Sequence, residues 1–185
     1  MRASIFFDMR AVAGNAGLVY TLRQTLLEEV KRQPVFLAHL ARNAMARTPP
    51  LGLFRQIVLE KEGTHAATLD LKHRGLVPII DLARFLALEA GCSSPKTLQR
   101  LRAAQERGGL SSEGLSELRA AFELIALLRL QHQARCVSRS EAPDSFIHPD
   151  ELSAAERRHL RDAFRVVKAT QDSIHLSHQL GDLSG

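Results

Sequence analysis

The sequence has no tryptophan and a single tyrosine, and aromatic residues make up only 5% of its 185 residues. Hydrophobic residues still reach 45%, so a core must be built mainly from Leu, Ile, Val and Ala. Unbranched Leu and Ala lose little entropy in a helix, whereas strands favour branched and aromatic side chains. The scarcity of aromatic residues therefore predicts an all-α fold.

Cysteine is almost as scarce, because Cys92 and Cys136 are the only two. They lie far apart and form no CxxC pair, so a structural zinc site is not predicted. No apolar stretch reaches about 18 residues, and the N-terminus lacks the pattern of a signal peptide. We expect a cytoplasmic protein that does not engage a membrane.

A concentrated patch of positive charge is also missing. The formal net charge of +5 would suit a polyanion such as nucleic acid. The basic residues, however, are scattered and interleaved with Glu and Asp rather than gathered in a stripe. The pattern does not predict a nucleic-acid partner.

Residues 3–12 are the one segment with strand character, and Gly14 and Asn15 then mark a turn. A single strand cannot satisfy its own hydrogen bonds. Either it pairs with a second copy in a homodimer, or its sheet belongs to sequence that this chain does not contain.

From Asn15 onward, apolar residues recur at helical spacing and Pro, Gly and Ser residues mark the ends of six helical segments. The first has the stripe Leu18, Leu22, Leu26 and Val30. A Ser111 cap opens a long central helix, and a capping box from Ser153 to Glu156 opens the last one. These segments predict an antiparallel bundle of about five to six helices.

Two stretches interrupt the helical pattern. Residues 48–76 contain three glycines and predict a long ordered loop with extended pieces, which in compact domains is often functional. Residues 138–150 contain Pro143 and Pro149 and predict a linker.

Five short motifs occur in an order that resembles a known family, the nucleotidyltransferase substrate-binding domain. The likeness runs from about Ile5 to about Gln179. The motifs are Phe7-Asp8-Met9-Arg10, Leu69-Asp70-Leu71-Lys72, Thr97-Leu98-Gln99-Arg100-Leu101, Leu128-Arg129-Leu130 and Leu152-Ser153-Ala154-Ala155-Glu156-Arg157.

The resemblance implies a bacterial signal-transduction protein. In that family the helical domain typically follows a nucleotidyltransferase core, often in a chain with CBS modules, and is similar to parts of PII uridylyltransferase. The resemblance then divides the chain into a remnant strand of the core at 1–14 and a helical substrate-binding domain at 15–185. It implies a protein or small-molecule acceptor as the bound substrate.

The superfamily's two-metal chemistry requires a Gly-Ser turn, an Asp-x-Asp pair and a third carboxylate that together hold Mg²⁺. This chain has no Asp-x-Asp pair and no Gly-Ser turn upstream of Asp8. Asp8 resembles the third carboxylate, and would be a metal ligand only together with the missing core. The alternative is an ion pair between Asp8 and Arg10, two residues on along one strand face. The chain alone is expected to be inactive and to bind no cofactor.

Five further residues are candidates for substrate binding. Asp70 and Lys72 share one face if their segment is extended, and either grip a substrate or form a local ion pair that holds the loop. Arg84, Arg100 and Arg129 lie on or beside apolar helix faces, where each is either paired with a buried carboxylate or faces a cleft for phosphate. His175 and His178, at i,i+3, are a weak metal candidate.

Two functions from different classes follow. The first is an accessory domain that positions the acceptor for nucleotidyl transfer by the absent core. The second is a regulatory interaction or dimerisation domain that buries the apolar segment at residues 4–12 and a helix face against another copy.

Overall fold

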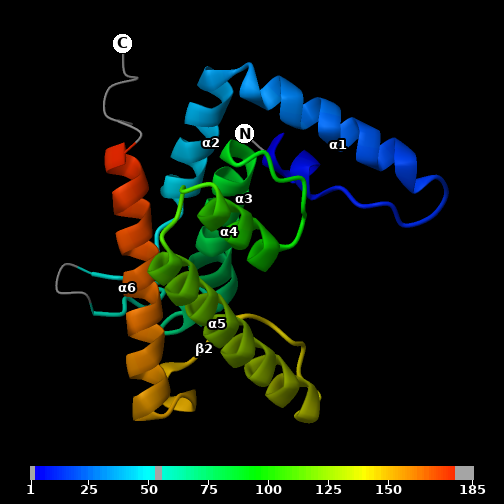
Figure 1. The fold of residues 1–185 in the computed structure, drawn as a ribbon. Helices are drawn as coiled ribbons and strands as arrows, with labels where there is room; N and C mark the ends of the chain where they lie inside the picture. The colour runs from blue at the N-terminus through cyan, green and yellow to red at the C-terminus, as the bar shows by residue number, and fades with distance from the viewer. Residues whose placement is uncertain (1–2, 53–55, 178–185) are drawn as a thin grey trace. The chain divides into compact units, whose positions relative to one another are not determined.

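The computed structural model describes residues 3–52 and 56–177, and their fold is all-α, as the composition predicts (Figure 1). Within these ranges the α-helices are α1 (Ala16–Lys31), α2 (Pro34–Ala46), α3 (Val77–Glu89), α4 (Thr97–Glu106), α5 (Ser112–Ser138) and α6 (Ala154–Ser177). Shorter helical elements are the 3₁₀-helices η1 (Ala3–Asp8) and η3 (Pro149–Glu151) and the π-helix η2 (Leu71–Leu76). The strands are β1 (Leu69–Asp70) and β2 (Phe146–Ile147).

The chain forms two compact units, each assembled from segments that are distant in sequence. Unit 1 comprises Met1–Ala46, Ile80–Leu115 and Ser173–Gly185, and unit 2 comprises Arg47–Ile79 and Ser116–Asp172.

In unit 1, α1 turns directly into α2, with Pro34 in the first turn of α2 as its missing N–H allows (Figure 1). The core of this unit is mainly aliphatic, with Phe85 and Phe7 also buried, and the ring centroid of Phe7 lies 6.0 Å from that of Phe36. The predicted apolar stripe of α1 is buried only towards its C-terminal end. Val30 is 4% exposed, whereas Leu18 is 71% and Leu22 is 48% exposed.

The predicted strand at residues 3–12 is wrong. Residues 3–8 form η1, and none of the described residues nearby pairs with them as a strand. Strand propensity is weak evidence without a partner strand, and here side-chain contacts of Phe7 and Asp8 fix the segment instead. A helix-like turn brings the Asp8 carboxylate to Arg84 of α3 and Arg100 of α4, and the Phe7 carbonyl accepts from Arg100 as well.

In unit 2 the fully buried side chains come mainly from α5 and α6, including Ile125 and Phe164. η2 packs closely against both helices because its Gly75 has no side chain. A Cβ there would lie 2.9 Å from Ile125 Cγ2 and 3.7 Å from Phe164 Cε1. The predicted capping box of α6 is confirmed, since Ser153 Oγ accepts from Glu156 N and Glu156 Oε2 accepts from Ser153 N.

The two non-helical stretches of the sequence meet in unit 2. β1 pairs with β2 in antiparallel register, with Leu69 opposite Ile147, and both side chains are fully buried. The prediction of a simple linker at 138–150 is therefore wrong for its second half, which packs as part of the core. The predicted loop at 48–76 does contain extended pieces, with a bridge between Leu51 and Ile57, but it ends at β1 because η2 begins at Leu71.

Within the described ranges, no helix combines the length and the apolar character that crossing a membrane requires.

Candidate functional site

Asp8 is the half-buried centre of an ionic cluster in unit 1 whose two arginines are buried. Its carboxylate receives Arg84 NH2 at 2.6 Å and Arg100 NH1 at 2.7 Å. Arg84 also donates through NH1 to Asp81 Oδ1 at 2.5 Å, so one guanidinium bridges two carboxylates. Two arginines thus face two aspartates, and the formal charges of the cluster balance.

Arg100 holds the cluster to the backbone as well. It is 2% exposed, and it donates through Nε to Ser94 O at 2.6 Å and through NH2 to Phe7 O at 2.9 Å. Burial on its own raises the pKa of Asp8. The hydrogen bonds and positive charges of Arg84 and Arg100 outweigh burial, so the pKa of Asp8 lies below its ordinary value of 3.8. Asp8 is therefore a fixed anion that joins η1 to α3 and α4.

These contacts show the ion-pair alternative for two of the arginines. Arg84 pairs with Asp8 and with the buried Asp81, and Arg100 pairs with Asp8, while their role in substrate binding stays a prediction. Asp8 does form an ion pair, but with Arg84 and Arg100 rather than with Arg10. Its role as a metal ligand stays a prediction, and a cation there would have to displace two guanidinium groups.

Asp70 and Lys72 do not form the expected pair on an extended segment. Asp70 instead caps η2, because its Oδ1 accepts from Lys72 N at 3.0 Å and from His73 N at 2.8 Å. Its other oxygen lies 2.9 Å from His73 Nδ1. Asp70 is 8% exposed and holds the loop as the structural alternative requires, while the Lys72 side chain is exposed.

Arg129 on α5 is half-buried and donates through Nε to Ser145 Oγ at 2.8 Å. Ser145 is buried and directly precedes β2, and its carbonyl accepts from Leu71 N at 2.9 Å. Arg129 therefore helps to attach the segment before β2 to α5, and its partner is a hydroxyl rather than a carboxylate.

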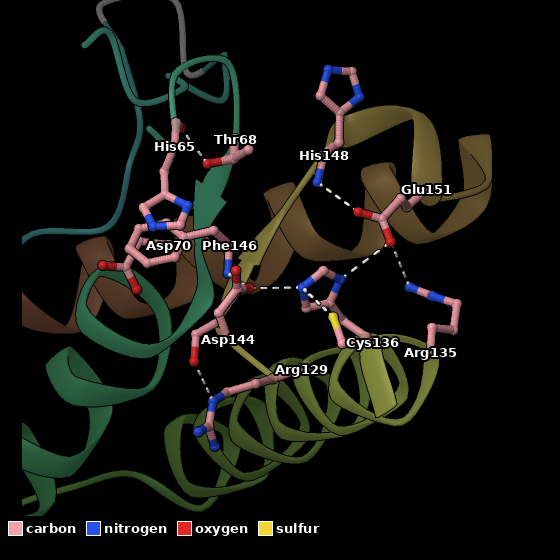
Figure 2. Close-up of polar contacts among 12 residues, drawn as sticks. His65, Thr68, Asp70, Arg129, Arg135, Cys136, Asp144, Phe146, His148 and Glu151 are labelled. Atoms are coloured by element: carbon pink, nitrogen blue, oxygen red, sulfur yellow. Dashed lines mark hydrogen bonds and ion pairs between the residues drawn. The ribbon is translucent and has the colours of Figure 1, made fainter. Parts of the chain in front are cut away.

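A histidine that the sequence pattern does not single out lies between Asp144 and Glu151, two carboxylates that Figure 2 labels in unit 2. His132 on α5 is 7% exposed, with Nε2 2.9 Å from Asp144 Oδ1 and Nδ1 3.2 Å from Glu151 Oε2. Cys136 Sγ lies 3.5 Å from the same Nε2. Since both ring nitrogens face a carboxylate oxygen, the doubly protonated ring is the form that can donate to both.

The two carboxylates also bind the backbone around β2 and η3. Burial on its own raises the pKa of Asp144 and of Glu151, but backbone N–H groups and His132 outweigh it, so both pKa values lie below their ordinary range. The donors are Phe146 N at 2.9 Å to Asp144 and His148 N at 3.0 Å to Glu151. Figure 2 also shows the ring of His65 stacked on that of Phe146, with centroids 3.7 Å apart.

These carboxylates and the histidine do not form a metal site. Among the described residues, no group of three or more His, Cys, Asp or Glu side chains is arranged to hold a metal ion. His175 lies near the end of α6, and its proposed partner His178 lies outside the described residues. The expected Mg²⁺ of the nucleotidyltransferase therefore stays a prediction.

A groove of about 300 Å³ in unit 2 is lined by arginines that the sequence analysis also missed. Arg157, Arg158 and Arg161 lie on α6, facing Gln56 and Ile57. Their spacing of three and four residues puts them on one helix face, which is a local signal visible in the sequence. Glu156 and Asp162 flank the three arginines in sequence, so the basic face is clear only when the residues are placed around the helix.

The sequence of this chain resembles a known protein family. Residues 34–178 match the family model described as "Putative nucleotidyltransferase substrate binding domain". The chain belongs to this family. None of the curated proteins and none of the solved structures matches the chain.

The matched range includes every candidate residue in unit 2, together with Arg84 and Arg100, but it begins after Asp8. The family assignment therefore covers the arginine groove and the His132 network, and it does not extend to η1.

Proposed function

We propose that this chain binds and positions the acceptor in a bacterial nucleotidyltransferase similar to the uridylyltransferases of signal transduction, while a separate core performs the transfer. The carrying observation is the family match over residues 34–178. In the reaction, a nucleophilic atom of the acceptor attacks the α-phosphorus of a nucleoside triphosphate. One bond from phosphorus to the acceptor forms, and the bond to the pyrophosphate leaving group breaks.

Positioning alone can lower the barrier of such a two-substrate reaction, because it removes the entropic cost of bringing the partners together. The polar clusters of both units support this division of labour. Ion pairs within each cluster occupy the polar groups of Asp8, Arg84, Arg100 and His132, and they hold irregular segments in place. The proposal places Mg²⁺ in the core, with the core and CBS modules as partners.

The test supplies the core with and without this chain and measures transfer of a labelled nucleotide to the acceptor in the presence of Mg²⁺. We expect the chain to lower the KM for the acceptor by about tenfold or more, equivalent to about 1.4 kcal/mol of binding. The chain alone should transfer nothing. An unchanged KM, or turnover by the chain alone, contradicts the proposal.

Dimerisation through α1 is a second candidate, favoured by the apolar side chains that this helix leaves exposed. Leu18, Tyr20 and Leu22 are 71%, 63% and 48% exposed, and Leu18 and Leu22 share one helix face. Light scattering should then report a dimer that the Leu18→Glu/Leu22→Glu variant dissociates. A wild-type chain that is monomeric at high micromolar concentration removes this candidate.

A further inference from the structure

The arginine groove of unit 2 is formed by one face of α6 and the end of an irregular segment. Ala154, Arg157, Arg158 and Arg161 line it from the helix, and Gln56 and Ile57 line it from the other side. Ile57 is fixed by its bridge with Leu51, and Gln56 O accepts from Gly52 N at 2.8 Å. The groove therefore has a rigid helix wall and a backbone-bonded opposite wall.

Among the described residues, no ion pair neutralises the positive charge in this groove. No carboxylate of the described residues forms an ion pair with Arg157, Arg158 or Arg161, and two of the three have exposed side chains. Further along the same helix the pattern is the opposite. Arg165 pairs with Asp162 at 3.2 Å, and Lys168 pairs with Asp172 at 2.5 Å. Arg157, Arg158 and Arg161 thus lack an ion pair among the described residues, whereas Arg165 and Lys168, further along the helix, are paired.

The three arginines differ in how far the protein occupies their donors. Arg157 donates through NH1 to Pro149 O at 2.9 Å and to Leu152 O at 2.7 Å, so it helps to hold η3. Arg161 has a buried Nε for which the described residues supply no acceptor. Arg161 Nε therefore keeps a hydrogen-bonding capacity that the described residues do not use.

We propose that this groove binds a phosphate group of a small molecule, with Arg158 and Arg161 as its principal donors. A guanidinium fork donates two parallel hydrogen bonds to phosphate oxygens, and its charge favours a dianion over a single carboxylate. The two sources of phosphate that fit are the triphosphate of the nucleotide donor and a phosphorylated acceptor. Naming these sources rests on the proposed function, whereas the anion site itself rests on the groove alone.

The experiment is isothermal titration calorimetry of the whole chain at low ionic strength, with inorganic phosphate, pyrophosphate, UMP, UTP and uridine as probes. We expect at least one phosphate-bearing probe to bind and uridine not to bind. Arg158→Gln/Arg161→Gln should weaken that binding about tenfold or more, which corresponds to about 1.4 kcal/mol. Arg165→Gln removes a paired charge from the same helix and should change the affinity less than about twofold.

The probes distinguish the sources of phosphate. Tighter binding of pyrophosphate and UTP than of phosphate and UMP assigns the groove to the nucleotide donor, and equal binding of UMP and UTP assigns it to a phosphate monoester on the acceptor. Undetectable binding of all four phosphate probes to the wild-type chain overturns the proposal, as does an unchanged affinity in the double variant. Far-ultraviolet circular dichroism and urea midpoints show that the variants are folded.

This experiment does not depend on transfer activity. If phosphate binds and the double variant loses it, but the chain leaves the KM of the core unchanged, the groove stands and the proposed function fails. If the chain lowers the KM and no phosphate probe binds, the proposed function stands and the groove fails.

Discussion

Arginines of this chain lie in two opposite environments. In unit 1, Arg84 and Arg100 are almost fully buried, and Asp8 and Asp81 neutralise them. In unit 2, Arg158 and Arg161 line a groove without an ion-pair partner among the described residues. An arginine that is buried beside a carboxylate therefore stabilises the fold. An arginine that lines a groove and has unused hydrogen-bond donors is instead available to bind a ligand.

The largest expected effect comes from removing a structural arginine. Arg100→Met keeps the volume but leaves Asp8 with one cation and two carbonyl oxygens without their donor. We expect the free energy of unfolding to fall by about 3 kcal/mol, as for other broken buried ion pairs. Urea denaturation followed by circular dichroism measures it. Arg102→Met, an exposed neighbour on α4, should change it by less than about 0.5 kcal/mol.

The histidine network of unit 2 should rank next. His132→Gln removes a ring whose two nitrogens lie 2.9 Å from Asp144 Oδ1 and 3.2 Å from Glu151 Oε2. We expect a loss of about 2 kcal/mol, because the ring's contacts with two ionised carboxylates disappear while these carboxylates stay partly exposed to water. The matched control is His159→Gln, an exposed histidine on α6. Equal urea midpoints for the two variants would show that the network does not stabilise unit 2.

Acid should weaken both clusters through their carboxylates. The pKa values of Asp8, Asp144 and Glu151 are lower in the folded chain than their ordinary values of 3.8, 3.8 and 4.5. Their stabilisation is thus complete above about pH 4.5 and is lost as the pH falls through the lowered values. Urea midpoints measured from pH 7 to pH 3 should fall in the acid range. The Asp144→Asn variant should fall less steeply, and a profile as steep as that of the wild type contradicts this assignment.

The smallest effect on stability is expected where the effect on binding is largest. Arg158→Gln/Arg161→Gln removes two charges that have no ion-pair partner among the described residues and one buried donor without an acceptor. We expect the free energy of unfolding to change by less than about 0.5 kcal/mol. A loss of unfolding free energy as large as that of Arg100→Met would show that these arginines also stabilise the fold, and would contradict the distinction between the two groups.

What could be predicted from sequence was local. The Ser111 cap and the Ser153–Glu156 capping box locate the starts of α5 and α6, because capping residues contact their own first turn. The same reasoning is wrong at residues 3–8, where a short apolar run predicts a strand but the structure has a 3₁₀-helix. The run is instead fixed by side chains that are 76 or more positions away in sequence.

The residues of the candidate site could also be predicted only where local sequence determines their surroundings. Arg84 and Arg100 were correctly placed beside apolar faces, but sequence spacing could not choose between a carboxylate and a phosphate as their partner. The pairing of Asp144 and Glu151 with His132 was equally out of reach, because it requires the strand β2 to fold back along α5. Periodicity locates the faces of helices, and tertiary contacts decide which of their polar groups remain free.

One nuclear magnetic resonance measurement tests the division between structural and ligand-binding arginines directly. The Nε–H signals of the arginine side chains are recorded while pyrophosphate is added to the folded chain. We predict that the signal of Arg161 shifts, while those of Arg84 and Arg100, whose Nε groups already face Asp8 Oδ1 and Ser94 O, stay in place. Shifts of Arg84 and Arg100 with an unmoved Arg161 would contradict the account.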